Sequence, residues 1–215
     1  MTNLVAQQQG LQGLWVIVLY HQRNVEPAYL GYIDRLRTIV PLEEWEAALV
    51  INNLAIRSVR KNTVMKQEGS IIKELYFVVN GCLRAYNTKK DNQESTRSIA
   101  FEHSYCWAIN FLNDLPAHEC IEALADSELL VFTKEKFNHL VDNSPNFRRA
   151  YMISLESMAL RYAARIETLL GLTAHERYQN LLLNSPDIVS TISNKIVASY
   201  LGITEQSLSR IKARR

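Results

Sequence analysis

The chain has 215 residues, 47% of them hydrophobic and 21% charged, which is an ordinary composition for a globular protein able to bury a core. Its formal net charge is only +2, so any affinity for nucleic acid must come from a local basic patch and not from the charge of the whole molecule. The three cysteines are far apart with no CxxC pair. This excludes a self-contained disulfide framework, offers no zinc or iron–sulfur spacing, and favours a reducing cytoplasm.

Residues 1–28 predict an N-terminal extension without a clear element of its own. The apolar stretch LWVIVLY, at 14–20, has seven residues, far below the ~20 needed to cross a bilayer. It also lacks the basic region and the small-residue cleavage site of a signal peptide. We expect no membrane contact, and a segment that is either loosely placed or the start of a helix docked on the body.

Residues 29–56 have the apolar spacing of two consecutive helices. Pro41 suits the first position of the second helix, where a missing N–H costs no intrahelical bond, and Glu43 and Glu44 suit its first turn. The second helix is therefore predicted to begin at Pro41.

The character changes after Val59, where β-branched and aromatic runs replace the helical spacing. Asn80-Gly81 lies between two such runs, in ELYFVVNGCLRAYN, and predicts a hairpin because both residues tolerate the positive φ of a type I′ turn. Further strand-like runs follow at 97–101, 118–124 and 127–133. Short strands at this spacing predict an antiparallel sandwich or barrel.

A long helix is predicted from Pro145 to about Leu170, because this stretch has no glycine and no second proline. Its apolar residues recur at spacings of three and four, which places them on one face: Tyr151, Leu155, Met158, Tyr162, Ile166 and Leu169. This face either packs on the core of its own domain or pairs with the same helix of a second subunit. Gly171 ends the helix, and a shorter one follows at 174–184.

The C-terminal stretch ISNKIVASYLGITEQSLSRIKARR predicts a helix-turn-helix. Ser193 suits the N-cap of a first helix over 195–201, Gly202 suits the tight turn, and Thr204 suits the cap of a second helix that begins at Glu205. One shared core is expected from Val197, Ala198, Leu201, Ile203, Leu208 and Ile211. Two helices joined by a three- or four-residue turn containing glycine form the unit that binds DNA.

The residues left outward on the second helix have the chemistry of DNA readers. They are Thr204, Glu205, Gln206, Ser207, Ser209, Arg210 and Lys212. Arg210 can donate two bonds to guanine, Gln206 suits adenine, and Glu205 either accepts from cytosine or only complements the helix dipole. The hydroxyl groups, Lys212 and the terminal arginines suit phosphates.

Four segments together carry a resemblance to the CRP/FNR superfamily of bacterial transcription regulators: ELYFVVNGCLRAY, EALADSELLVF, LTAHERYQNLL and ASYLGITEQSLSRI. The likeness extends from Tyr29 to the C-terminus and is greatest to small regulators of Bacteroidetes-type bacteria. It implies an α+β fold with a cyclic-nucleotide-binding-like β-roll at 29–144, a dimerisation helix at 145–171 and a helix-turn-helix domain at 172–215. It also implies a homodimer that reads an inverted repeat in double-stranded DNA, with the apolar face of the long helix as its seam, and RNA polymerase is a candidate further partner.

Two departures from this family pattern bear on function. Its cyclic-nucleotide sensors hold the ligand with a Gly-Glu pair and an Arg after a Pro, whereas here Ala108 and Ile109 stand near the first place and Ala117-His118-Glu119 near the second. Glu119 would repel a phosphate, so cyclic AMP dependence is not expected. The candidate effector pocket is Trp107, Asn110, His118 and Glu119, unless Trp107 and Phe111 fill it and no effector binds. The chain also stops one turn after Arg210, without the β-hairpin wing of larger relatives.

Two other functions are alternatives to a transcription regulator. One is a cyclic-nucleotide or other small-ligand sensor whose helical tail mediates protein contacts. The other is an enzyme of the cupin type, which would need closely spaced histidines for a metal. The five histidines are scattered with no HxH pair, so we expect no metal, no cofactor and no catalytic role.

Overall fold

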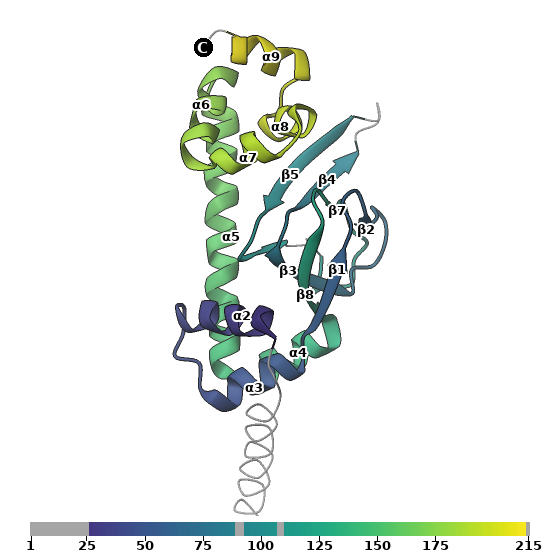
Figure 1. Ribbon diagram of the computed structural model, residues 1–215, viewed down its shortest axis with the longest axis vertical. Coiled ribbons are helices and arrows are strands. Elements are labelled where there is room, and N and C mark those ends of the chain that lie inside the picture. Colours follow the sequence, from purple (N-terminus) through teal and green to yellow (C-terminus); the bar gives the residue numbers. More distant parts are fainter. Residues whose placement is uncertain (1–25, 89–92, 107–109, 214–215) are drawn as a thin grey trace, which may run out of the picture.

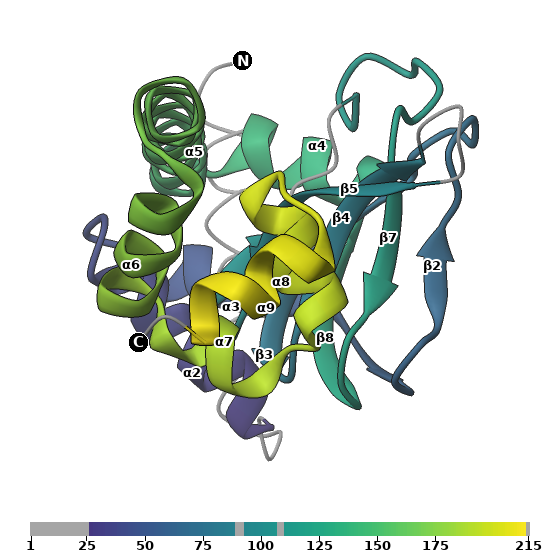
Figure 2. The ribbon, with the colours of Figure 1, turned by 90° about the horizontal axis from the view of Figure 1, so that it is seen from above.

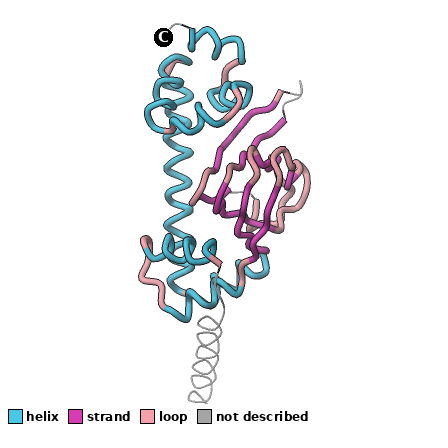
Figure 3. The backbone as a smooth tube through the Cα atoms, viewed as in Figure 1, coloured by secondary structure: helices cyan, strands magenta, loops and turns pink. Residues whose placement is uncertain are grey.

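The computed structural model describes residues 26–88, 93–106 and 110–213. Most of the N-terminal extension therefore lies outside the described residues. One long helix, α5 (Pro145–Gly171), runs along the molecule, with helices α2 to α4 around one end, helices α6 to α9 at the other, and the strands at its side (Figure 1). The tube in Figure 3 shows that helix and strand segregate into these separate parts. The predicted α+β class is confirmed.

The two helices before the strands are α2 (Pro27–Arg37) and α3 (Glu44–Asn52). The second begins at Glu44 and not at Pro41, so that prediction is wrong by one turn. The backbone N–H of the N-cap residue Glu43 donates to the Glu46 side chain at 3.1 Å. This capping contact fixes the helix start three residues beyond the proline.

Two four-stranded antiparallel sheets form the β-roll, which confirms the predicted sandwich or barrel. One sheet has the order β1-β8-β3-β6 and the other β2-β7-β4-β5. The strands are β1 (Ala55–Val59), β2 (Val64–Lys66), β3 (Glu74–Asn80), β4 (Leu83–Thr88), β5 (Glu94–Ala100), β6 (Ser104–Cys106), β7 (Cys120–Ala123) and β8 (Ser127–Thr133).

Asn80 and Gly81 do not close a hairpin, which corrects the sequence prediction. Strand β3 pairs with β6 and β8, whereas β4 pairs with β5 and β7, so the two residues carry the chain from one sheet to the other. Gly81 has φ +97°, and a Cβ there would lie 2.7 Å from the carbonyl oxygen of Asp126. The glycine is needed because the backbone passes this close to the β7–β8 corner.

The main core fills the roll and extends under the helices that close it. Leu75, Leu83 and Phe132 are fully buried between the sheets. Tyr32 of α2 lies edge-on to Phe77 of β3, with ring centroids 4.7 Å apart. Phe147 of α5 completes the aromatic cluster beside Phe132. The first turns of α5 are thus part of the roll's own core.

The start of α5 is anchored by a buried carboxylate. After α4 (Lys134–Asn143), the Ser144 hydroxyl accepts from the backbone N–H of Phe147 at 3.0 Å and donates to Glu46 at 2.6 Å. Glu46 also accepts from the backbone and side-chain nitrogens of Asn146, at 3.0 and 2.7 Å. Burial alone would raise the pKa of Glu46, but these hydrogen bonds outweigh it and lower the pKa below its usual value.

A second core holds the C-terminal helices α6 (Ala174–Asn184), α7 (Pro186–Thr191), α8 (Asn194–Leu201) and α9 (Glu205–Ala213). Tyr178, Leu181, Ile188, Val197 and Leu208 are buried in it. Side chains of the roll join this core as well, namely Cys82, Ile99, Phe101 and Leu124. The C-terminal domain therefore packs on the roll, and Figure 2 shows α8 in front of β4 and β5.

Candidate nucleic-acid interface

Helices α8 and α9 form the predicted helix-turn-helix. Gly202 ends α8 in the left-handed region with φ +68°, and Ala198, where the two helices cross, is 2% exposed. The Thr204 hydroxyl accepts from the backbone N–H of Ser207 at 3.2 Å and so caps α9. Leu208 is fully buried and holds α9 against α8. The turn, the core and the Thr204 cap predicted for this unit are confirmed, whereas Ser193 stands at the N-cap of α8 without a capping hydrogen bond from its side chain.

The outer face of α9 is open. Thr204, Glu205, Gln206, Ser209 and Arg210 are exposed, and Ser207 and Lys212 are half-buried. Helix α9 lies at the end of the molecule, far from α3 (Figure 1). The five exposed candidate DNA-reading residues can thus be reached by a partner approaching along this end.

Few charged side chains of this face interact with the rest of the described chain. Within the part of the chain that the structure describes, Arg210 and Glu205 make no hydrogen bond or ion pair with another side chain. Lys212 donates to Asn194 on α8 at 2.5 Å. Both roles considered for Glu205, contact with a base and compensation of the helix dipole, are compatible with its place at the first position of α9. Arg214 and Arg215 lie outside the described residues.

The predicted seam of α5 lies mostly against its own subunit. Tyr151 packs edge-on against Phe137 of α4 at 4.8 Å, and Leu155 and Met158 pack on the core of the roll. Tyr162 lies 5.2 Å from the Arg97 guanidinium of β5. Only the two most C-terminal positions, Ile166 and Leu169, are exposed. The intramolecular alternative therefore accounts for four of the six residues.

A second apolar stripe follows an open side of α5 that adjoins the predicted face and shares Ile166 with it. Its large members are Met152, Leu160, Ile166 and Leu170, with exposures of 63%, 65%, 57% and 84%. The exposed Ala159 and Ala163 lie between them. Met152, Ala159 and Ile166 recur every seven residues, and so do Ala163 and Leu170, which is the repeat of a helix pair in close contact. We call this set of six residues the outer stripe.

Glu119 of the candidate effector pocket is buried and paired. Its carboxylate receives both Nε and a terminal nitrogen of Arg97, the latter at 2.6 Å. The two side chains are 5% and 20% exposed. From the sequence, Glu119 was expected to be a free negative charge that repels a phosphate. In the structure its charge is neutralised by the Arg97 guanidinium of β5. A β-bulge between Ala85 and Tyr86 makes Arg97 the extra residue of its strand.

The other predicted pocket residues do not converge on a site. His118 is exposed, and the side chain of Asn110 donates to the carbonyl of Pro116 at 2.9 Å. Phe111 is buried against Phe137, with ring centroids 5.3 Å apart. Trp107, with Ala108 and Ile109, lies outside the described residues. Burial raises the pKa of the Cys106 thiol to about 12, so it is unreactive at neutral pH.

A cleft of about 630 Å³ lies elsewhere, between α5, α2, α7 and the β5–β6 turn. Its wall carries arginines and carboxylates together, Arg35 and Arg161 with Glu102 and Asp187, besides several serines and tyrosines. This mixed lining selects no particular class of ligand. Among the described residues, histidine, cysteine and acidic side chains form no group that could hold a metal ion.

Several solved structures share this fold. FixK2 from Bradyrhizobium japonicum has a TM-score of 0.65 at 19% identity, over 75% of this chain and 83% of that one. The c-di-GMP responsive global regulator CLP of Xanthomonas campestris has a TM-score of 0.66 at 15% identity, over 80% and 91%. A Eubacterium rectale protein described as a regulator of the crp/fnr family has a TM-score of 0.64 at 19% identity, over 88% and 86%.

The sequence itself matches one known family. Residues 56–144 match the cyclic nucleotide-binding domain, which is the roll with its following helix α4. A comparison with curated protein sequences found no match. The chain is thus a cyclic-nucleotide-binding-type roll joined to a helical C-terminal domain, in the fold of the CRP/FNR transcription regulators. The expected likeness of its fold to that superfamily is confirmed, while the Bacteroidetes branch stays a prediction. No described helix has the length and apolar character of a membrane span.

Proposed function

We propose that this protein is a homodimeric DNA-binding transcription regulator that reads an inverted repeat with α9. The observation that carries the proposal is the capped, well-packed helix-turn-helix whose second helix leaves its base-reading side chains open to solvent. Arg210 is the principal reader, because its guanidinium can donate two bonds to guanine and has no carboxylate partner among the described residues.

The dimer forms through the outer stripe, which shares only Ile166 with the face predicted from sequence. Tyr151, Leu155 and Met158 already pack on the subunit's own core, whereas Met152, Ile166 and Leu170 are exposed. The small Ala159 and Ala163 at the centre let two α5 helices approach closely. Such pairing would present two α9 helices to successive major grooves, about 34 Å apart.

DNA binding is proposed to need no cyclic AMP. Ala117 stands where the sensors of this superfamily carry the phosphate-binding Arg, and it is buried at 2% exposure. Arg97, the nearby cation, is already paired with Glu119. A cyclic phosphate would therefore be desolvated without gaining a cationic partner. The protein has no catalytic role in this proposal.

Selection of duplexes from a random pool by the purified full-length protein, without added ligand, tests the proposal. We expect an inverted repeat, bound with an affinity that falls steeply with salt. Arg210→Ala should weaken binding by about 5- to 150-fold and relax the preference at one base of each half-site. Arg149→Ala, an exposed change near the far end of α5, is the matched control and should bind normally. Recovery of no sequence above background would reject the proposal.

A further inference from the structure

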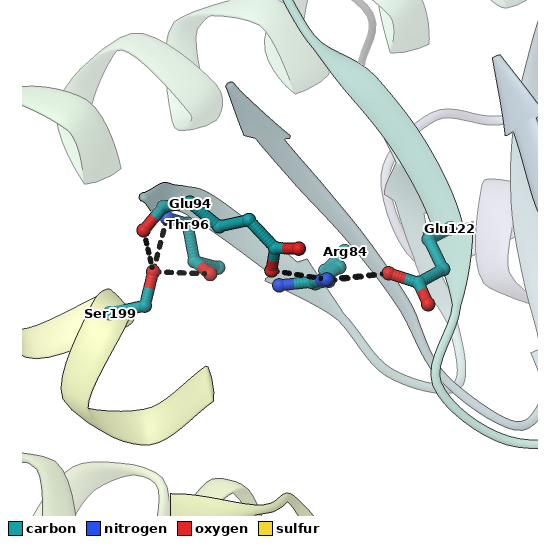
Figure 4. A network of polar contacts seen from close by, with 5 residues as sticks. All are labelled: Arg84, Glu94, Thr96, Glu122 and Ser199. Atoms are coloured by element: carbon teal, nitrogen blue, oxygen red, sulfur yellow. Dashed lines mark hydrogen bonds and ion pairs between the residues drawn. The ribbon is translucent and has the colours of Figure 1, made fainter. Parts of the chain in front are cut away.

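One serine of the helix-turn-helix holds the edge of the β-roll. Strand β5 is an edge strand of its sheet, so part of its backbone needs partners outside the sheet. The Ser199 hydroxyl of α8 donates to the carbonyl of Glu94 at 2.8 Å and accepts from the N–H of Thr96 at 2.8 Å (Figure 4). It also lies 3.0 Å from the Thr96 hydroxyl, and Thr96 is only 1% exposed. Ser199 thus takes the place of a neighbouring strand.

An arginine of the long helix joins the same point. A terminal nitrogen of Arg165 donates to the carbonyl of Thr96 at 3.2 Å and to the carbonyl of Tyr200 at 2.6 Å. Its guanidinium also lies 3.9 Å from the centroid of the Tyr200 ring. Arg165 therefore connects three parts of the chain: α5, strand β5 of the roll and helix α8 of the DNA-binding domain.

These contacts are directional in a way that the neighbouring apolar contacts are not. The covalent link from α5 to the C-terminal domain passes through Leu172, which has extended backbone and ends the helix. Rotation there would swing α9 relative to α5 while apolar side chains could still slide past one another. The hydrogen bonds of Ser199 and Arg165 have fixed geometry and oppose that rotation.

We propose that Ser199 and Arg165 are positioning residues that set the distance between the two recognition helices of the dimer, and hence the half-site spacing that the protein accepts. The inference rests on the proposed function, since spacing has meaning only for a dimer on DNA. Neither residue needs to touch DNA: each acts by fixing α8, and through it α9, on a frame made of α5 and β5.

The test measures spacing selectivity and half-site affinity separately. The probes are the inverted repeat selected by the wild-type protein, the same repeat with two base pairs added or removed at its centre, and a single half-site. A change of two base pairs is about a fifth of a helical turn. We expect the wild-type protein to prefer the selected spacing strongly. Ser199→Ala and Arg165→Gln should each reduce that preference roughly tenfold, since each removes two or more hydrogen bonds.

Half-site affinity should stay within twofold of wild type in both variants, because the reading face of α9 is unchanged. A variant that merely destabilised the domain would instead weaken half-site binding. Ser199→Thr keeps a hydroxyl and should restore the preference. Ser190→Ala removes only local bonds within α7, to the Asp187 carbonyl at 3.3 Å and to the Thr191 hydroxyl at 3.5 Å, and Thr168→Ala removes a bond within α5; these two variants are the matched controls.

The outcomes separate the two proposals. Unchanged spacing preference in Ser199→Ala and Arg165→Gln would overturn this inference and leave the proposed function standing. A wild-type protein that binds neither the repeat nor the half-site would instead overturn the proposed function.

Discussion

Replacement of Met152 tests which side of α5 forms the dimer, because Met152 belongs to the outer stripe and not to the face predicted from sequence. Its side chain is 63% exposed. Complete burial of a methionine side chain contributes about 1.5–3 kcal/mol. Since more than half of this side chain is still open, its burial in a dimer contributes about 1–2 kcal/mol per subunit. Two-fold symmetry counts each position twice, so Met152→Ala should weaken the dimer by about 2–4 kcal/mol.

That loss corresponds to a rise of roughly 30- to 1000-fold in the dimer dissociation constant. Sedimentation equilibrium over a range of protein concentrations measures it directly, and circular dichroism checks that the helices are retained. Alanine favours helix more than methionine does, so α5 itself should persist in the variant.

Met158→Ala is the opposing control, because Met158 packs on the subunit's own core. It should lower the free energy of unfolding and leave the dissociation constant within about threefold, on the rule that distant sites act independently. If Met158→Ala dissociated the dimer and Met152→Ala did not, the face predicted from sequence would be the true seam. The assignment of the outer stripe would then be wrong.

Three further changes probe the roll and its anchor. Gly81→Ala should destabilise the protein by about 3 kcal/mol in urea unfolding, because it combines a positive φ with overlap of the Ser127 side chain; a loss below about 1 kcal/mol would contradict the close approach. Glu119→Gln leaves Arg97 without its carboxylate and should cost about 2 kcal/mol, less than for a fully buried pair because Arg97 is partly exposed; Arg97→Gln with Glu119→Gln should recover part of the loss. The lowered pKa of Glu46 means that its contribution to stability is present above its usual pKa and is lost as pH falls through the lowered value. Unfolding free energy measured from about pH 6 to about pH 3 should therefore fall more in wild type than in Glu46→Gln, and equal slopes would exclude this role.

The features that were predicted well from the sequence depend on residues that lie close together in the chain. The helix-turn-helix needs a cap at Thr204, a left-handed Gly202 and an apolar register, all within about one turn of each other, so local physics decides the outcome. The long helix α5 is equally local, since Pro145 and Gly171 mark both ends. These elements follow from residues that are neighbours in the chain.

The face of α5 could not be assigned in this way, because the helix is apolar on two sides. Tyr151, Leu155 and Met158 form one stripe, Met152 and Leu170 belong to another, and Ile166 lies on both. Spacing shows that stripes exist but not which one the roll covers, and that depends on how α4 and the sheets are placed. The Asn80-Gly81 turn failed for a related reason: the dipeptide fits a hairpin locally, but β3 and β4 find their partners in different sheets.

The pairing of Glu119 with Arg97 depends on a single irregularity of β5. In a regular antiparallel pair, two residues that lie two positions apart on β5 face two residues that lie two positions apart on β4. Here the bulge places Ser98 opposite Ala85 and Thr96 opposite Tyr86, which are consecutive residues of β4. Arg97 is the extra residue and turns toward Glu119, while its neighbour Thr96 is held by Ser199 and Arg165. Arg97, the partner of Glu119, and Thr96, the residue held by α8 and α5, are therefore neighbours in one strand. A change that displaces Arg97 from Glu119 would act one peptide unit from the contacts that orient α8, so this short path physically connects the Glu119 ion pair with the C-terminal helices.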